Sequence, residues 1–223
     1  MLSKIGIGQV CGFLFLFILL TSALSRFFTG GPPDTGNMPN ALSAVAEGGK
    51  KFRIGIAVDL VSHVSIIALA GLLYLAFSRY NKSLALLGTL WRVAEGTIMG
   101  LNEVNYIMLL AVAQNFVSAT GAEASVLETI GHTLIQAEGW GLKIGVAFLA
   151  LGHLLYAILF VSSGAVPLSL GWFGILASIL AAGGIWLNLI NPNLSMVSVM
   201  VLIPYEIVLG FWLLIRGRQI GAS

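Results

Sequence analysis

The stretch LKIGVAFLALGHLLYAILFVS, residues 142–162, decides the fold class of this protein. It has one lysine near its start and one histidine in its middle, and nearly all its other residues are apolar or small. At 1.5 Å per residue a helix of this length is about 30 Å long, which matches the hydrocarbon core of a bilayer. The stretch therefore predicts a membrane-spanning helix.

Five further runs of this kind occur, and none has the alternating pattern of a membrane β-strand. The six predicted spans cover residues 5–25, 53–77, 84–117, 142–162, 168–190 and 196–215. The expected fold class is all-α, a polytopic membrane helix bundle with six transmembrane helices plus interfacial helices. No repeat or linker marks a boundary, so residues 1–223 are expected to form a single integral membrane domain.

The composition excludes several other classes of protein. Of the 223 residues, 58% are hydrophobic and only 9% are charged, which is too few charges for a soluble surface and too apolar for a disordered chain. The net charge of +2 is too small for a nucleic-acid footprint. Because Cys11 is the only cysteine, the chain has no disulfide framework of its own.

Three segments between or beside the spans have their own patterns. Residues 29–40 contain a Gly-Gly-Pro-Pro sequence and are expected to form an extramembrane loop. Residues 40–49 predict a short, weakly amphipathic helix. Residues 119–140 carry acidic residues and an apolar stripe at helical spacing, which predicts a helix lying at the membrane interface. The first run is expected to be a retained anchor helix.

The predicted location is the cell membrane, with both termini in the cytoplasm. Basic residues divide equally between the two sides, but those assigned to the inside lie in short loops and tails, where such charges orient a protein best. The expected partners are the lipid bilayer and a small ligand or ion, with no nucleic acid. Assembly into a homo-oligomer is left open.

Polar side chains inside the predicted spans are the candidate functional residues, because a charged residue at the centre of a membrane helix costs roughly 2.5–3.5 kcal/mol. We expect a ligand- or ion-binding cavity formed by Asp59, His63, Arg92, Glu95, Asn102, His153, Tyr156 and Glu206. Counted from the predicted helix starts, five of these residues lie near mid-depth. Those five are Asp59, His63, Glu95, His153 and Glu206.

Two local features refine this expectation. Arg92 is expected within ion-pair reach of a carboxylate, either Glu95 or Glu206, because an unpaired charge would be costly in the bilayer. Pro204 is expected to kink the sixth span just before Glu206, because proline removes a backbone hydrogen bond.

Three motifs resemble those of a known family. They are Arg92-Val93-Ala94-Glu95, Gly152-His153-Leu154-Leu155-Tyr156, and the run from Glu206 to Leu214. In order and spacing they resemble the bacterial and archaeal membrane family catalogued as domain of unknown function 4386. The resemblance implies a six-helix integral membrane protein and no particular activity.

The residues leave three classes of function open. The favoured class is a transporter or sensor that binds a small ligand, lipid or ion in the polar cavity. A second class is a membrane metal- or haem-binding enzyme, in which Asp59 and His63 share a metal with another of the mid-depth residues, or His63 and His153 hold a haem iron. The third is a scaffold whose polar groups fix helix packing. We expect no cofactor, and whether the protein is an enzyme is left open.

Overall fold

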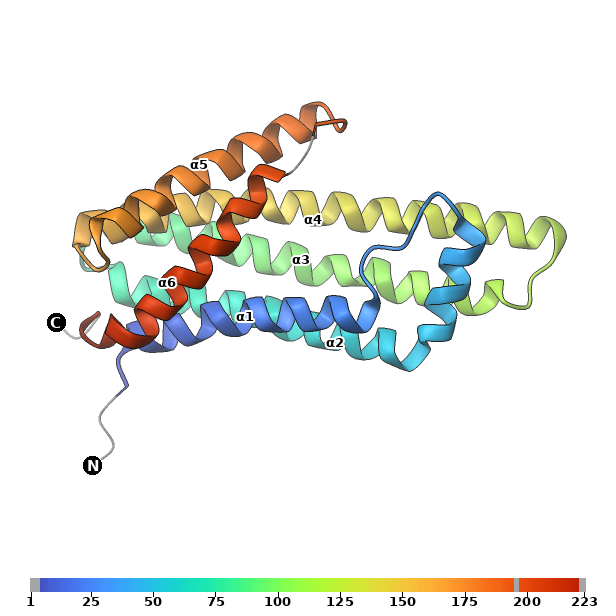
Figure 1. Cartoon of the computed structure of the whole chain (residues 1–223), viewed down its shortest axis with the longest axis horizontal. Coiled ribbons are helices and arrows are strands. Elements are labelled where there is room, and N and C mark those ends of the chain that lie inside the picture. Colours follow the sequence, from blue (N-terminus) through green and yellow to red (C-terminus); the bar gives the residue numbers. More distant parts are fainter. Residues whose placement is uncertain (1–4, 195–196, 221–223) are drawn as a thin grey trace. The chain divides into compact units, whose positions relative to one another are not determined.

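The computed structural model describes residues 5–194 and 197–220. The chain is 87% helical and no strand occurs among the described residues, so the all-α prediction is confirmed. Six helical stretches are long and apolar enough to cross a membrane (Figure 1). The helices are α1 (Ile7–Thr29), α2 (Met38–Phe77), α3 (Lys82–Phe116), α4 (Gly121–Ser163), α5 (Leu168–Ile190) and α6 (Leu202–Arg216), with the short 3₁₀ helices η1 (Val197–Val201) before α6 and η2 (Gly217–Gln219) after it.

The predicted spans locate the six helices, but α4 begins much earlier than expected, whereas α2 combines the short helix predicted at residues 40–49 with the second span, on either side of a break at Gly49. The fifth span, 168–190, coincides with α5. In contrast, α4 has 43 residues, about twice the 20 residues that cross a bilayer. Residue 196, the expected start of the sixth span, lies outside the described residues. The mid-depth position counted from residue 142 therefore started from a point inside α4.

The predicted interfacial helix at residues 119–140 is the first part of α4, and it continues into the fourth span without a break. Its apolar stripe packs on protein. Ile135 is buried, and Leu127 and Leu134 are partly buried, in a core formed with α2 and α3. The helix predicted here is therefore present as the first part of α4, and its position at the membrane interface stays a prediction.

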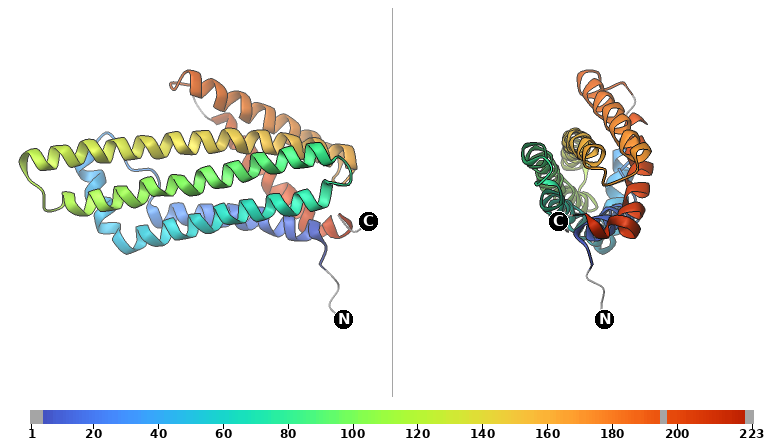
Figure 2. Two further views of the ribbon diagram at one scale, coloured as in Figure 1. Left: turned by 180° about the vertical axis from the view of Figure 1, so that it is seen from behind. Right: turned by 90° about the vertical axis from the view of Figure 1, so that its left-hand side faces the viewer.

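Contacts within the chain divide it into two compact units. Unit 1 consists of Met1–Leu19, Val64–Thr97 and Lys143–Ser223, and unit 2 of Leu20–His63 and Ile98–Leu142. In unit 1 the start of α1, the α2–α3 turn, the α4–α5 turn and the end of α6 lie at one end (Figures 1 and 2). Each unit has its own apolar core. The single domain expected from the sequence stays a prediction.

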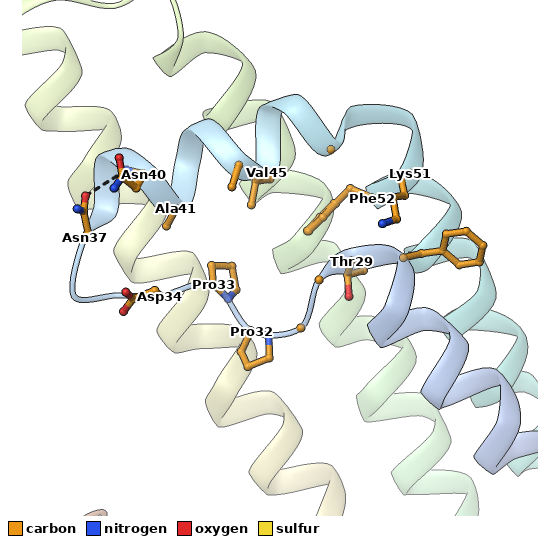
Figure 3. Close-up of a pocket in the computed structure, with 15 residues that line it drawn as sticks. Thr29, Pro32, Pro33, Asp34, Asn37, Asn40, Ala41, Val45, Lys51 and Phe52 are labelled. Atoms are coloured by element: carbon orange, nitrogen blue, oxygen red, sulfur yellow. Dashed lines mark hydrogen bonds between the residues drawn. The ribbon is translucent and has the colours of Figure 1, made fainter.

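In unit 2, the loop after α1 leads directly into the first part of α2. The Asn37 side chain accepts a hydrogen bond from the backbone N–H of Asn40 at 3.2 Å, which caps the start of α2. The weakly amphipathic segment is helical, as predicted, with Leu42 and Val45 in the core. Gly49, at φ 25°, then bends α2 in a conformation that favours glycine. Figure 3 shows the cavity of about 510 Å³ between this loop and this helix.

Pro204 does not kink the middle of a helix. It lies in the first turn of α6, which begins at Leu202 directly after η1. Proline is tolerated in a first turn, because the backbone N–H groups there have no partner within the helix. Instead of the expected kink, the structure has a change from 3₁₀ helix to α-helix at Leu202, two residues before Pro204.

Candidate functional site

The predicted site residues fall into two groups, one in each unit. Unit 1 holds Arg92, Glu95, His153, Tyr156 and Glu206, and unit 2 holds Asp59, His63 and Asn102. A cavity common to all eight stays a prediction. Each unit, however, brings its own members together.

In unit 1, Arg92 and Glu95 form a buried ion pair on α3. Arg92 Nη1 lies 2.8 Å from Glu95 Oε2, and the two side chains are 3% and 0% exposed. Their spacing of three residues places both side chains on one face of the helix. The predicted ion pair of Arg92 is thus present, with Glu95 as its partner. Because the pair is buried, removing either partner would strongly destabilise the folded protein, since the other charge would remain buried and unpaired.

His153 on α4 connects this ion pair to α6. Arg92 Nη1 donates a hydrogen bond to His153 Nδ1 at 3.1 Å, and His153 Nε2 lies 2.8 Å from Glu206 Oε1. Glu206 is 12% exposed and His153 is buried. We call Arg92, Glu95, His153 and Glu206 the Arg92 cluster. Its members form a continuous chain of polar contacts from α3 through α4 to α6.

The contact with Arg92 determines where the His153 ring carries its proton. A guanidinium has only N–H donors, so the nitrogen facing it has to accept. A neutral His153 ring is therefore protonated at Nε2, the atom that faces Glu206. A doubly protonated ring would have to turn Nδ1–H away from Arg92, and the Leu149 carbonyl 3.3 Å from Nδ1 is an acceptor for it.

Three members of the Arg92 cluster lie at the same distance from one end of unit 1. Arg92 is ten residues from the start of α3 at Lys82, His153 is ten residues from the end of α4, and Glu206 is ten from the end of α6. At 1.5 Å per residue each is about 15 Å from that end, half the thickness of a hydrocarbon core. Arg92, His153 and Glu206 therefore lie at a common depth in unit 1.

The surroundings of the Arg92 cluster are apolar and tightly packed. Phe15 and Tyr205 contact the His153 ring edge-on, with ring centroids 6.1 and 6.0 Å away. Tyr156 lines the same cavity, but its hydroxyl hydrogen bonds to Thr89 at 2.6 Å. The cavity measures about 10 Å³, which is at the lower limit for one water molecule. The Arg92 cluster therefore has no room for an organic ligand.

This geometry also bears on the haem hypothesis. Both ring nitrogens of His153 have polar neighbours, Arg92 at Nδ1 and Glu206 at Nε2. A haem iron would need one of these nitrogens. In the described arrangement an iron would have to displace Arg92 or Glu206 from the ring.

In unit 2, Asp59 and His63 on α2 meet Glu103 on α3. One ligand atom from each residue lies within 4.8 Å of the other two, and His63 Nε2 is 3.6 Å from Glu103 Oε1. His63 and Glu103 are buried, whereas Asp59 is partly exposed. We call these three residues the Asp59 cluster. Sequence reasoning did not include Glu103 among the site residues.

A cavity of about 90 Å³ adjoins the Asp59 cluster. Its lining includes further polar residues absent from the predicted site, namely Ser25, Arg26, Tyr106 and Glu138. Asn102 lines it too, but its amide is engaged elsewhere: it donates to the Glu138 carbonyl at 2.9 Å and accepts from Asn105 at 2.8 Å. Asn102 therefore joins α3 to α4, and the charged groups around it face the cavity.

Comparison with known proteins adds a family and no activity. No curated protein and no solved structure matches the chain. A family described as Domain of unknown function (DUF4386) matches residues 10–217. That range includes both polar clusters and all but the ends of the chain, so this protein belongs to the DUF4386 family.

Proposed function

We propose that this protein is a membrane transporter or sensor in which the Arg92 cluster binds and releases a proton. One observation carries the proposal: a single guanidinium is shared within a buried chain that contains two carboxyl groups and an imidazole. Such residues inside a membrane span are costly, and proton relays are a recurrent use of them.

The count of charges favours one bound proton. With both carboxylates ionised and His153 neutral, the Arg92 cluster has a net charge of −1, because Arg92 is its only fixed cation. A net charge is expensive in an apolar environment, and one additional proton removes it. We expect the Glu206 carboxylate to hold this proton, because Nε2 of a neutral His153 already carries one and Nδ1 faces Arg92.

The size of the cavity favours a proton over a larger ligand at this site. A volume of about 10 Å³ leaves no space for an organic molecule. The small ligand, lipid or second ion of a transporter would bind elsewhere.

We further propose that the protein resides in the cell membrane with its termini in the cytoplasm, in contact with lipid and free of nucleic acid.

Infrared titration tests this proposal directly. Purified protein is reconstituted in liposomes, and the band of protonated carboxylic acids is followed as the pH is raised. We expect wild type to lose a carboxylic-acid band that is absent from Glu206→Gln at every pH. Glu123→Gln, which changes an exposed glutamate at the start of α4, is the matched control and should titrate like wild type.

The alternative is a scaffold in which Glu206 has only a structural role. Glutamine is nearly isosteric and still accepts a hydrogen bond, so Glu206→Gln should keep its helix content and its melting temperature within a few degrees. If Glu206→Gln misfolds and Arg92→Met restores folding, the Arg92 cluster is a structural ion network. In that case the scaffold hypothesis replaces the proton site.

A further inference from the structure

We infer that the Asp59 cluster is a binding site for one divalent transition-metal ion, with Asp59, His63 and Glu103 as its protein ligands. The inference uses residues of unit 2 only and does not depend on the proton site in unit 1. It also departs from the sequence-based expectation of no cofactor. The metal hypothesis drawn from the sequence took its third ligand from the other mid-depth residues, whereas the structure places Glu103 beside Asp59 and His63.

The distances suit ligands of one ion better than they suit direct hydrogen bonds. At 3.6 Å, His63 Nε2 and Glu103 Oε1 are too far apart for a good hydrogen bond. Two atoms bound to one tetrahedral zinc at about 2.1 Å lie about 3.4 Å from each other. A ligand atom of Asp59 lies within 4.8 Å of both partners, so a small adjustment of side chains would complete a three-ligand set.

A buried polar atom in the Asp59 cluster lacks a partner. Among the described residues, Glu103 Oε2 makes no hydrogen bond, although the side chain is more than nine-tenths buried. Buried polar groups are normally satisfied, and an ion is one of the partners that can satisfy them. Ser25 hydrogen bonds to the Asp59 carboxylate, an arrangement that orients metal-binding carboxylates in known sites.

The charge of the cavity complements a divalent cation. Its lining contains three carboxylates, those of Asp59, Glu103 and Glu138, and one guanidinium, that of Arg26. With His63 neutral, the net charge is −2, which one divalent ion would neutralise. The volume of about 90 Å³ has room for the ion and its remaining water ligands.

The types of ligand indicate the class of metal. An imidazole beside two carboxylates suits zinc and its first-row neighbours, whereas calcium and magnesium prefer sites made only of oxygen. Three protein ligands with space for water resemble open zinc sites more than the closed four-ligand sites of structural zinc.

Titration with Zn²⁺ tests the inference. Full-length protein in detergent is stripped with a chelator and titrated by calorimetry, with all variants made in a His132→Gln background to remove the half-buried histidine of α4. We expect one Zn²⁺ per chain, with that binding abolished in Asp59→Asn, His63→Gln or Glu103→Gln. Ser25→Ala should weaken it about ten-fold. Glu123→Gln and Glu206→Gln should bind like the parent, which separates this result from the fate of the proton site.

A second measurement uses only the parent protein, so it does not depend on whether the ligand variants fold. The parent protein is loaded with Cu²⁺, and electron paramagnetic resonance should show coupling to one imidazole nitrogen. No Zn²⁺ binding above that of detergent alone, a copper spectrum without nitrogen coupling, unchanged Zn²⁺ binding in folded ligand variants, or a preference for Mg²⁺ or Ca²⁺ would each overturn the inference.

Discussion

At the scale of single residues, Arg92 is the side chain on which the Arg92 cluster depends. One nitrogen, Nη1, contacts both Glu95 and His153. Glu95 is completely buried, and among the described residues its other oxygen makes no hydrogen bond. Without Arg92, the charge of Glu95 would have no compensating cation in the cluster.

The stability of Arg92 variants tests this dependence. We expect Arg92→Met to lower the free energy of unfolding by about 3–5 kcal/mol, because it leaves a buried carboxylate without its partner. The double variant Arg92→Met, Glu95→Gln should recover most of this loss, because neither charge is then present. Thermal unfolding in detergent measures both effects. Equal stability of the single variant and wild type would contradict the ion pair.

The sequence predicted an ion pair of Arg92 with either Glu95 or Glu206, but not the other contacts of the cluster. Arg92 and Glu95 are three residues apart, and helix geometry alone brings them together. The contact between His153 and Glu206 joins α4 to α6. It depends on how these two helices pack, which the spacing of residues along one helix does not specify.

At the scale of helices, the spacing of residues along α3 could have identified Glu103. Glu103 is eleven residues after Arg92, and eleven residues are close to three full turns of an α-helix. Glu103 therefore lies on the same stripe as Arg92, and the eleven-residue spacing was the signal that could have identified it. Asn102, included in the predicted site, instead bonds α4 through its side chain.

The close approach of α3 and α4 depends on Gly152. A Cβ atom at this position would lie 2.8 Å from Cδ of Arg92, so any side chain has to displace the arginine. We expect Gly152→Ala to lower the melting temperature and to weaken the contact between Arg92 and His153. Gly183 on α5 has no atom within 4 Å of the corresponding position, so Gly183→Ala is the control.

The two alanine variants should change stability in opposite directions. Replacing an unhindered helical glycine by alanine stabilises a helix by roughly 0.5–1 kcal/mol, and we expect this for Gly183→Ala. Calorimetric or fluorescence melting curves of the two purified variants provide the comparison. A Gly152→Ala protein as stable as Gly183→Ala would show that α3 and α4 are not closely packed at Arg92.

Hydropathy located all six membrane helices but not the full length of α4. Hydropathy reports the part of a helix that suits lipid, whereas the first part of α4 buries Ile135 against protein and exposes Glu123. The same mixture of residues occurs on a helix at a membrane surface. Only the packing partner distinguishes the two arrangements, and the sequence of one segment does not identify it.

At the scale of the whole molecule, the number of crossings predicts which loops share a side of the membrane. With the N-terminus in the cytoplasm, the loop after α1 faces outward and the turn between α2 and α3 faces inward. Thr35 and Tyr80 are exposed residues of these two segments, and Cys11, the only native cysteine, is buried.

Cysteine labelling in intact cells tests this topology. We expect a membrane-impermeant maleimide to modify Thr35→Cys from outside and to modify Tyr80→Cys only after the cells are permeabilised. Wild type, whose Cys11 is buried, is the control for background labelling. Modification of Tyr80→Cys alone in intact cells would mean that the termini face outward.

The proton site remains the central claim about the molecule, and the state of His153 tests it most directly. The chain has only three histidines, so nitrogen-15 NMR of histidine-labelled protein can be assigned with single variants. We predict a neutral His153 ring protonated at Nε2, with signals that move on acidification in wild type and stay fixed in Glu206→Gln. A ring protonated at Nδ1 alone, or signals indifferent to both Glu206→Gln and Arg92→Met, would contradict the proposed proton site.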